Sequence, residues 1–271
     1  MPFLRRDLII STALTPASGL EERAQSLAAE LGAPFVPRGD ESLAHLFAQT
    51  SGADRALLVQ TRRLLLVSRD GQELFYHPNM AFLRLGNLLR GGRDLLIEAA
   101  ALQPGDRVLD ATLGYASEAI LCAYAVGECG VVHGIEAVPE LGILVREGLQ
   151  TVVTRQKNLN ALMRRIEVVH LGHHREYLRA CPTGSYDVIC FDPFFEEALP
   201  DSAVNYTPLR AFGDHTPLLP DVLAEAQRVA RRRVVVKTVR RGSTLADLGI
   251  TDRYDSRGGK VTYGILRGSD G

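Results

Sequence analysis

The sequence predicts an α/β protein with two unequal parts. From residue 104 onward, short apolar runs alternate with longer segments in which apolar residues recur at helical spacing. This alternation favours a Rossmann-like parallel sheet with helices on both faces. Before residue 77, a shorter set of strands and helices includes the hairpin signal Asp70-Gly71. We therefore expect a small N-terminal α/β domain at residues 1–76 and a larger domain at residues 77–271.

The N-terminal domain is expected to hold two helices among short strands. Apolar residues recur at helical spacing in segments 19–31 and 41–50. Strands are expected at residues 7–12, 34–38 and 55–61, and on both sides of the hairpin within residues 63–76. The segment 77–102 then predicts a turn, a helical piece, a break at Gly91-Gly92 and a second helix.

The larger domain shows a regular order of elements. Strands are expected at residues 107–111, 130–137, 165–171, 186–192, 232–239 and 260–267. Helices are expected at residues 116–127, 139–153, 174–181 and 217–231.

The composition is that of an ordinary globular protein. Of the 271 residues, 46% are hydrophobic and 23% are charged. The net charge of -1 gives no overall basic field that would indicate a nucleic-acid partner. The four cysteines form no CxxC pair, so we expect neither a metal site nor a disulfide framework.

The N-terminal stretch "MPFLRRDLIISTALTPASG" resembles a secretion signal only superficially. Asp7 begins its apolar part, and that part has the length of a strand. No run in the sequence approaches the ~18 apolar residues that a membrane span needs. We expect a cytoplasmic protein with no membrane partner, and the sequence leaves its oligomeric state open.

A ligand site is expected where the strands of the larger sheet end. The first strand ends in Asp110, and the loop "DATLGYASEA" follows, with Gly114 for a tight turn and a helix start near Ser117. Such a helix N-terminus offers unpaired N–H groups to a ligand. The second strand ends in Glu136, and an acid at this place can accept hydrogen bonds from both hydroxyls of a ribose. The alternative is that Asp110 only caps a loop and that Glu136 only closes a strand.

The chemistry of this loop favours S-adenosylmethionine as the cofactor. The loop lacks the GxGxxG pattern that a pyrophosphate cofactor usually requires. The carboxylate of Asp110 would repel a pyrophosphate but tolerate a cationic ligand. Gly172 and His173 follow the third strand at the same edge, where an adenine could sit. For His173, a polar loop histidine is an equal alternative.

The fourth strand ends in an acid, a proline and two aromatic rings, Asp192-Pro193-Phe194-Phe195. Proline fixes its own backbone and holds the preceding Asp192 extended. A carboxylate beside a ring suits a planar substrate that carries an amino group, because Phe194 or Phe195 can stack on its flat face. The alternative is that both rings pack in the core, and we expect this of one of them. These four residues are the expected catalytic residues.

Three segments of the chain resemble the class I S-adenosylmethionine-dependent methyltransferases: "VLDATLGYASEA", "GIEA" and "YDVICFDPFF". Within this class the chain resembles the small-subunit ribosomal RNA guanine-N2 methyltransferase J family. That family carries an "LDAT-GLGRDA"-type loop, a "DPMFP"-type motif, a "GGR" stretch like Gly91-Gly92-Arg93 and a "VVVK" strand like Val234 to Lys237. The resemblance covers roughly residues 75–267 and implies the class I methyltransferase form of the Rossmann-like sheet.

The resemblance also implies functions for particular residues, with Asp192 at the junction of cofactor and substrate. Together with the loop described above, the expected cofactor-binding residues are Asp110, Thr112, Gly114, Ser117, Glu118, Glu136, Ala137, Gly172, His173 and Asp192. The chain departs from the family pattern in the loop, where Gly114-Tyr115-Ala116 and Ser117-Glu118 replace its Gly-Leu-Gly and Arg-Asp. Glu196 replaces the proline after the motif.

Four cations are expected to bind the substrate: Arg84, Arg93, Arg210 and Lys237. They could hold RNA phosphates, although a solvated charge run is an equal alternative. Arg210 lies in "PLRAFGDHTPL", a long loop expected to fold over the site as a lid. The resulting hypothesis is methyl transfer to a guanine N2 in ribosomal RNA, free or in the small ribosomal subunit. The alternatives are a methyltransferase for another RNA or a small molecule, an NAD-dependent oxidoreductase and a non-catalytic RNA-binding factor.

Overall fold

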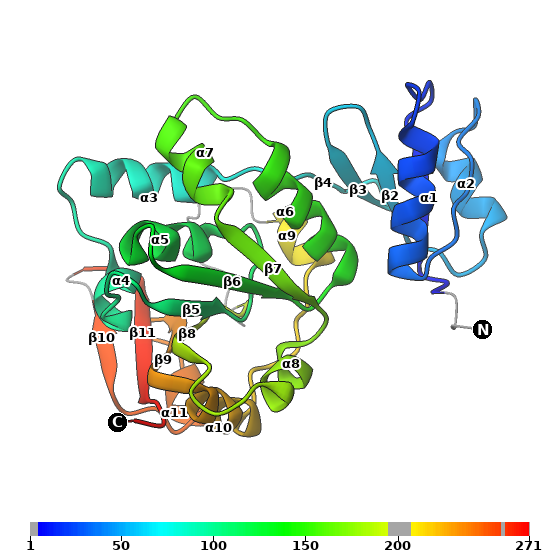
Figure 1. The fold of residues 1–271 in the computed structure, drawn as a ribbon. Helices are drawn as coiled ribbons and strands as arrows, with labels where there is room; N and C mark the ends of the chain where they lie inside the picture. The colour runs from blue at the N-terminus through cyan, green and yellow to red at the C-terminus, as the bar shows by residue number, and fades with distance from the viewer. Residues whose placement is uncertain (1–4, 195–206, 256–257, 271) are drawn as a thin grey trace.

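Two sheets organise the chain. The structure is a computed structural model, and it describes residues 5–194, 207–255 and 258–270. The N-terminal sheet has four strands in the order β1-β2-β3-β4, and the larger sheet has seven in the order β10-β11-β9-β8-β5-β6-β7. Figure 1 shows the N-terminal unit, in blue, beside the larger sheet and next to helix α6.

The N-terminal sheet is mixed and is covered by a helix on each face. Its strands are β1 (Leu8–Thr12), β2 (Arg55–Val59), β3 (Leu64–Ser68) and β4 (Glu73–Leu74), and only β1 and β2 run parallel. Helices α1 (Leu20–Leu31) and α2 (Leu43–Gln49) pack on opposite faces. Alternate strand residues face each helix, because side chains in a strand point to opposite sides in turn.

The prediction of a strand at residues 34–38 is wrong. This segment makes only a single bridge, between Ile10 and Phe35. Pro34 and Pro37 stand on either side of Phe35 and Val36, and a proline has no N–H with which to continue a strand ladder.

The larger sheet has five parallel strands and an antiparallel edge. The parallel strands are β5 (Arg107–Asp110), β6 (Val131–Glu136), β7 (Ile166–Leu171), β8 (Tyr186–Phe191) and β9 (Ala230–Val239). The edge is formed by β11 (Val261–Arg267), antiparallel to both β9 and β10 (Arg253–Asp255). The strand order reverses at β5, which lies between β6 and β8, so the ends of β5 and β8 mark the ligand-binding crevice of such sheets.

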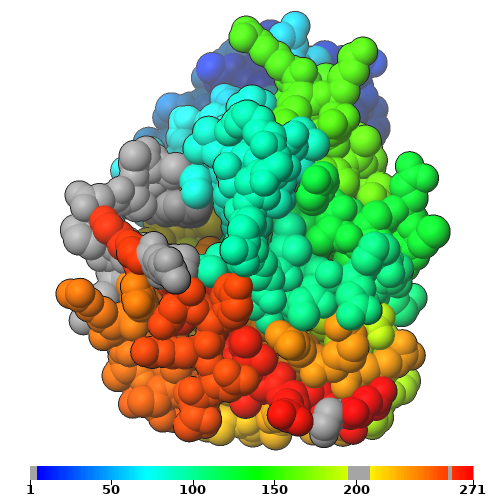
Figure 2. Space-filling view, turned by 90° about the vertical axis from the view of Figure 1, so that its left-hand side faces the viewer, coloured from blue at the N-terminus to red at the C-terminus, as the bar shows by residue number. Residues whose placement is uncertain are grey.

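Helices cover both faces of this sheet and give it two apolar layers. The first face carries α3 (Asn79–Leu89), α4 (Leu95–Ala100), α5 (Ser117–Val126), α6 (Pro139–Thr151) and α7 (Lys157–Met163). The second carries α8 (His174–Ala180), α10 (Pro220–Val229) and α11 (Thr244–Asp247), while α9 (Thr207–Phe212) adds Leu209 and Phe212 to the first layer. The fold class expected from the alternating pattern is therefore confirmed. Figure 2 shows the cyan segment with α3 and α4 beside the orange and red C-terminal strands.

Helix α6 lies between the two sheets. It packs on β6 and β7 of the larger sheet and on β3 of the N-terminal sheet. The carboxylate of Glu140 on α6 is fully buried and is held by Arg5 at 2.7 Å and by Arg55 at 3.0 Å. Apolar residues of both sheets belong to one continuous cluster. The two units thus pack as one body, and we propose the domain boundary near residue 76, where the chain leaves β4.

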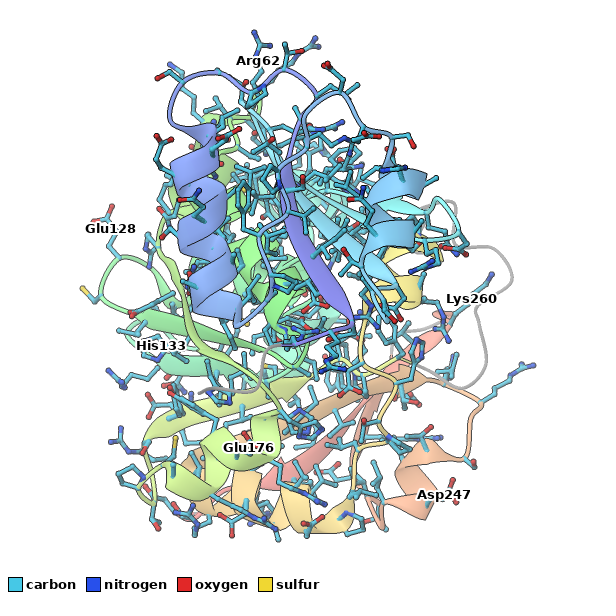
Figure 3. The ribbon with its side chains drawn as sticks, turned by 90° about the vertical axis from the view of Figure 1, so that its right-hand side faces the viewer. Arg62, Glu128, His133, Glu176, Asp247 and Lys260 are labelled. Atoms are coloured by element: carbon cyan, nitrogen blue, oxygen red, sulfur yellow. The ribbon has the colours of Figure 1, made fainter. Side chains whose placement is uncertain are left out.

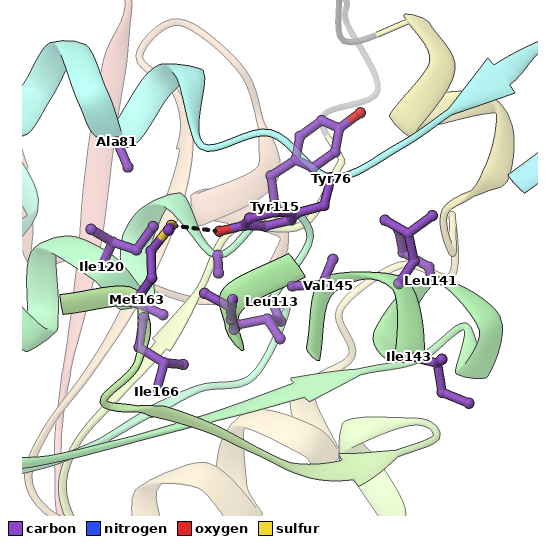
Figure 4. Packing of buried hydrophobic residues seen from close by; sticks show 14 of the residues in the cluster. Tyr76, Ala81, Leu113, Tyr115, Ile120, Leu141, Ile143, Val145, Met163 and Ile166 are labelled. Carbon is purple, nitrogen blue, oxygen red and sulfur yellow. Dashed lines mark hydrogen bonds between the residues drawn. The ribbon is translucent and has the colours of Figure 1, made fainter. Parts of the chain in front are cut away.

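The connection between the units is itself packed against the larger one. The ring of Tyr76 lies directly on Gly148 of α6, where an added Cβ would come within 2.2 Å of it. The hydroxyl of Tyr76 donates to the sulfur of Met163 at 3.5 Å, as the dashed line in Figure 4 marks. Within the described residues, no helix combines the length and the apolar character that crossing a bilayer requires.

Candidate active site

The predicted acids converge at the carboxyl edge of the larger sheet. Asp110 ends β5, Glu136 ends β6 and Asp192 follows β8. Beside them lies a cavity of about 340 Å³. The sequence-predicted residues in its wall are Thr112, Gly114, Ser117, Glu118, Glu136, Ala137, Asp192, Pro193, Phe194, Arg210 and Lys237. Phe195, also predicted to act here, lies outside the described residues.

Glu136 joins the end of β6 to the loop after β5. Its Oε2 accepts a hydrogen bond from the N–H of Gly114 at 3.0 Å, and its Oε1 accepts one from the N–H of Val138 at 3.1 Å. Gly114 has a φ of +48°, a conformation that glycine adopts without strain. Burial raises the pKa of Glu136 to about 7. Each carboxylate oxygen still has a second lone pair, so this acid can also accept hydrogen bonds from ribose hydroxyls.

Asp110 lies buried below the cavity. Its Oδ1 accepts from the N–H of Thr112 at 3.2 Å, while its Oδ2 is buried and has no hydrogen-bond partner among the described atoms. Burial, and next the charge of Glu118, raise the pKa of Asp110 to about 8. An unpartnered buried carboxylate oxygen is costly unless a ligand compensates it. The acceptor oxygens of Asp110 and Glu136 therefore fit S-adenosylmethionine, a cation that also carries a ribose.

Glu118, in the first turn of α5, is bound by two cations. Its Oε1 accepts from Nζ of Lys237 at 2.8 Å and from Nη1 of Arg84 at 2.6 Å. Burial alone would raise the pKa of Glu118, but the charges of Lys237 and Arg84 outweigh it and lower that pKa to about 2. Arg84 and Lys237 were predicted to hold RNA phosphates. The structure instead places both in contact with buried carboxylates.

The Asp192-Pro193-Phe194 segment forms the wall next to β8. The N–H of Asp192 donates to the hydroxyl of Thr112 at 2.6 Å, and Nζ of Lys237 donates to Oδ2 of Asp192 at 2.7 Å. The ring of Phe194 stacks with His215 at 4.9 Å between centroids, and the guanidinium carbon of Arg210 lies 5.3 Å from its centroid. Phe194 thus already has stacking partners from the segment after β8. Arg210 lies on helix α9, in a segment that was expected to be a loop.

Besides Asp110 and Arg84, three predicted site residues lie outside the cavity wall. The N–H of Gly172 donates to the backbone oxygen of Glu136 at 2.9 Å, so this glycine supports the end of β6. His173 caps α8 by accepting from the N–H of Arg175 at 3.2 Å. Arg93 is 78% exposed and pairs with Glu98.

His174 lines the cavity and was not predicted, whereas Asp214, which also lines it, belongs to the segment "PLRAFGDHTPL" that was expected to cover the site. Burial lowers the pKa of His174 to about 4, so its imidazole is neutral at pH 7. Nε2 of this buried ring has no partner among the described atoms. Oδ2 of Asp214 lies 3.6 Å from Nε2 of His173. The run "HLGHH" at the end of β7 indicated this region in the sequence. The histidine that lines the cavity, however, is His174, the last residue of the run, and not the predicted His173.

This strand order, with an acid at the end of β5 and another at the end of β6, is that of the class I S-adenosylmethionine-dependent methyltransferase fold. The chain belongs to the family described as "Putative SAM-dependent methyltransferase", whose model matches residues 45–260. S-adenosylmethionine is therefore its cofactor, and the NAD-dependent alternative is set aside. Among the described residues, no group of three or more His, Cys, Asp or Glu side chains is arranged to hold a metal ion.

A curated relative and a solved structure show the same likeness along most of the chain. "Uncharacterized protein YpiP" of Bacillus subtilis (strain 168) is 37% identical over 230 residues, which cover 84% of this chain and 88% of the relative. The crystal structure of the SAM-dependent methyltransferase NGO1261 from Neisseria gonorrhoeae is similar with a TM-score of 0.65 at 18% identity, covering 97% of both chains. At this identity, the second likeness shows the fold.

Proposed function

We propose that this methyltransferase acts on the exocyclic N2 of a guanine in small-subunit ribosomal RNA. The observation that carries the proposal is the Asp192 carboxylate, which is fixed at the cavity wall beside Pro193 and Phe194. A fixed carboxylate is an acceptor for an amino N–H group, and an adjacent ring favours a flat base. The resemblance of "YDVICFDPFF" to the guanine-N2 family supports the choice of base. Such a substrate would place the enzyme in the cytoplasm.

Different residues would bind the cofactor and the base. Bound S-adenosylmethionine supplies an electrophilic methyl group on a sulfonium sulfur. Glu136 would hold the ribose, and Asp110 would balance the positive charge. Asp192 would accept an N–H of the base amino group and so orient the nitrogen toward the methyl carbon. Alignment of the two reacting atoms is the main contribution that an enzyme makes to such a transfer.

The direct test is to identify the methylated nucleoside. RNA from a strain that lacks the gene is incubated with the purified protein and isotope-labelled S-adenosylmethionine, then digested and analysed by mass spectrometry. We expect label in N2-methylguanosine from the small-subunit RNA. Label in transfer RNA, in a pyrimidine or in protein would show that the substrate is another one. Total absence of transfer, with the cofactor bound, would support a non-catalytic RNA-binding factor.

A pair of variants tests the role of Asp192 in the same assay. Asp192→Asn removes the charge but keeps the shape of the side chain, and we expect transfer to fall by about 10²-fold if alignment is lost. Asp247→Asn is the matched control, since Asp247 lies on the outer surface of α11, as Figure 3 shows. Equal activity of the two variants would contradict the proposed role.

A further inference from the structure

Lys237 occupies an unusual place for a lysine. It lies in β9 between Val236 and Thr238, both at most 1% exposed. In the sheet register Phe191 pairs with Val236, so Asp192 and Lys237 follow at the same level of neighbouring strands. Nζ of Lys237 lies 2.7 Å from Oδ2 of Asp192 and 2.8 Å from Oε1 of Glu118. A largely buried ammonium group requires such partners.

The ion pairs continue away from the cavity as a chain. Arg84 contacts Glu118 through Nη1 at 2.6 Å. Its Nε and Nη2 form a forked pair with Asp94 at 2.9 and 3.0 Å. Asp94 also caps α4 by accepting from the N–H of Leu96 at 3.1 Å. Three carboxylates and two cations thus alternate from α4 through α3, α5 and β9 to the end of β8, and each cation contacts two carboxylates.

This alternation determines the state of the carboxylate nearest the cavity. Burial raises the pKa of Asp192, and the charge of Lys237 acts against that rise. Burial alone would lower the pKa of Lys237, but the charges of Asp192 and Glu118 raise it well above its ordinary value. Lys237 therefore stays charged at neutral pH. Two of the three N–H groups of Lys237 already bond to carboxylates, and these carboxylates balance its charge, so this lysine is poorly suited to hold an RNA phosphate.

We propose that Lys237 is a positioning residue that keeps the Asp192 carboxylate ionised and oriented, and that Glu118, Arg84 and Asp94 hold Lys237 in place. This inference rests on the proposed function, in which Asp192 accepts an N–H of the substrate amino group. Among the described residues, the hydrogen bonds to the Asp192 carboxylate go to Oδ2. We assign Oδ1 to the substrate.

The test compares Lys237→Met with Lys237→Arg, and Lys260→Met serves as the matched control on the exposed surface (Figure 3). With saturating cofactor, we expect Lys237→Met to lower kcat by about 10²-fold through misalignment, while affinity for S-adenosylmethionine is retained. Lys237→Arg should restore a large part of kcat, because it keeps the charge. A kcat for Lys237→Met equal to that of Lys260→Met would overturn the inference.

The pH profile gives a readout that a merely structural role would not move. Without Lys237, burial of Asp192 is opposed only by the smaller effect of the Arg84 charge, so the acidic limb of kcat/KM should shift to higher pH. The charged and titratable groups near Asp192 are Lys237 on β9, Glu118 on α5, Arg84 on α3, Asp110 on β5 and Tyr263 on β11. Of these, only Lys237 is removed, so an unshifted limb in Lys237→Met contradicts the inference.

Two further variants separate the possible failures. If Lys237→Met does not fold, the double variant Asp192→Asn/Lys237→Met removes both partners and leaves no unpaired charge between them. Its kcat should equal that of Asp192→Asn, and a large additional loss would overturn the positioning role. Full activity of Asp192→Asn alone would refute the role of Asp192 in the proposed function, and with it this inference. A low activity of Asp192→Asn with normal activity of Lys237→Met would refute only this inference.

Discussion

At the scale of single residues, the site is a set of carboxylates in unequal environments. Asp110 and Glu136 have only backbone N–H donors as described partners, and burial raises the pKa of both. Glu118 lies between two cations and its pKa is lowered. A ligand that carries a positive charge compensates the first two acids, whereas the protein itself has already compensated the third.

The affinity for S-adenosylmethionine should depend on pH through Asp110. Burial raises the pKa of this acid to about 8, so we expect it to be largely neutral at pH 6 and charged at pH 9. We expect binding of S-adenosylmethionine to tighten over this range, because its sulfonium is attracted to the carboxylate. S-adenosylhomocysteine has a neutral sulfur and the same ribose, so its curve should be flatter. Calorimetric titrations of both ligands measure the difference, and Asp110→Asn should remove it. Parallel curves in the wild type would contradict the role of Asp110.

The same acid predicts how the stability of the ligand-free protein changes with pH. The folded-state pKa is raised above the ordinary value of 3.8 to about 8, so the folded state holds a proton that the unfolded state releases. Between these values the wild type therefore loses stability as the pH rises. The Tm of Asp110→Asn relative to that of the wild type should accordingly increase from pH 5 to pH 8.5. Thermal melts at both values check this, with Asp247→Asn as the control that shows no such trend.

At the scale of helices and strands, the sequence predicted most accurately the elements whose apolar pattern extends over many residues. Helices α1, α5, α6 and α10 and the parallel strands appeared where expected. Helices α7 and α11 have 7 and 4 residues, and β10 has 3. None of these three was predicted, whereas α2 and α8, with 7 residues each, were, because a short element shows a periodic pattern only where its few apolar residues happen to be well spaced.

In the site, too, the sequence predicted one part of the arrangement and not another. The convergence of Asp110, Glu136 and Asp192 followed from the rule that parallel strands end at one edge. The pairing of Lys237 with Asp192 depends on the register of β9 on β8, and that register is not encoded in either strand alone.

Two glycines in helices give opposite expectations for the same substitution. A Cβ at Gly148 of α6 would lie 2.2 Å from the ring of Tyr76. Gly148→Ala should therefore destabilise the protein by about 1–3 kcal/mol through overpacking. A Cβ at Gly86 of α3 would meet only Nη1 of Arg90, at 3.5 Å. Gly86→Ala should stabilise by about 0.5–1 kcal/mol through the gain in helix propensity. Urea denaturation of both variants measures the two effects, and the same sign for both would contradict this account.

At the scale of the whole molecule, charged contacts attach the N-terminal unit to α6. Arg5 and Arg55 bind the buried Glu140, and Arg146 forms a forked pair with Glu30 at 2.7 and 2.9 Å. The first contact is buried on the carboxylate side, whereas both partners of the second are more than a third exposed. The two contacts should differ in energy, because water screens the exposed pair.

Matched substitutions measure this difference. Glu140→Gln should cost about 1.5–3 kcal/mol, as expected for hydrogen bonds to a charged group. Glu30→Gln should cost at most about 1 kcal/mol, the usual value of an exposed ion pair. The free energy of unfolding in urea is the measurement for both. A cost for Glu30→Gln as large as that for Glu140→Gln would show that burial of Glu140 is not what holds the unit.

The strand order of the larger sheet also affects the rates of folding and unfolding. The cavity wall draws on residues from Met80 to Val261, and β5 pairs with β8, with Leu109 opposite Ile189, about 80 residues apart in sequence. Contacts between such distant segments form late, because a long loop must close first. A partly folded chain therefore has no place for the cofactor. Bound S-adenosylmethionine should lower the rate of unfolding and leave the rate of refolding almost unchanged.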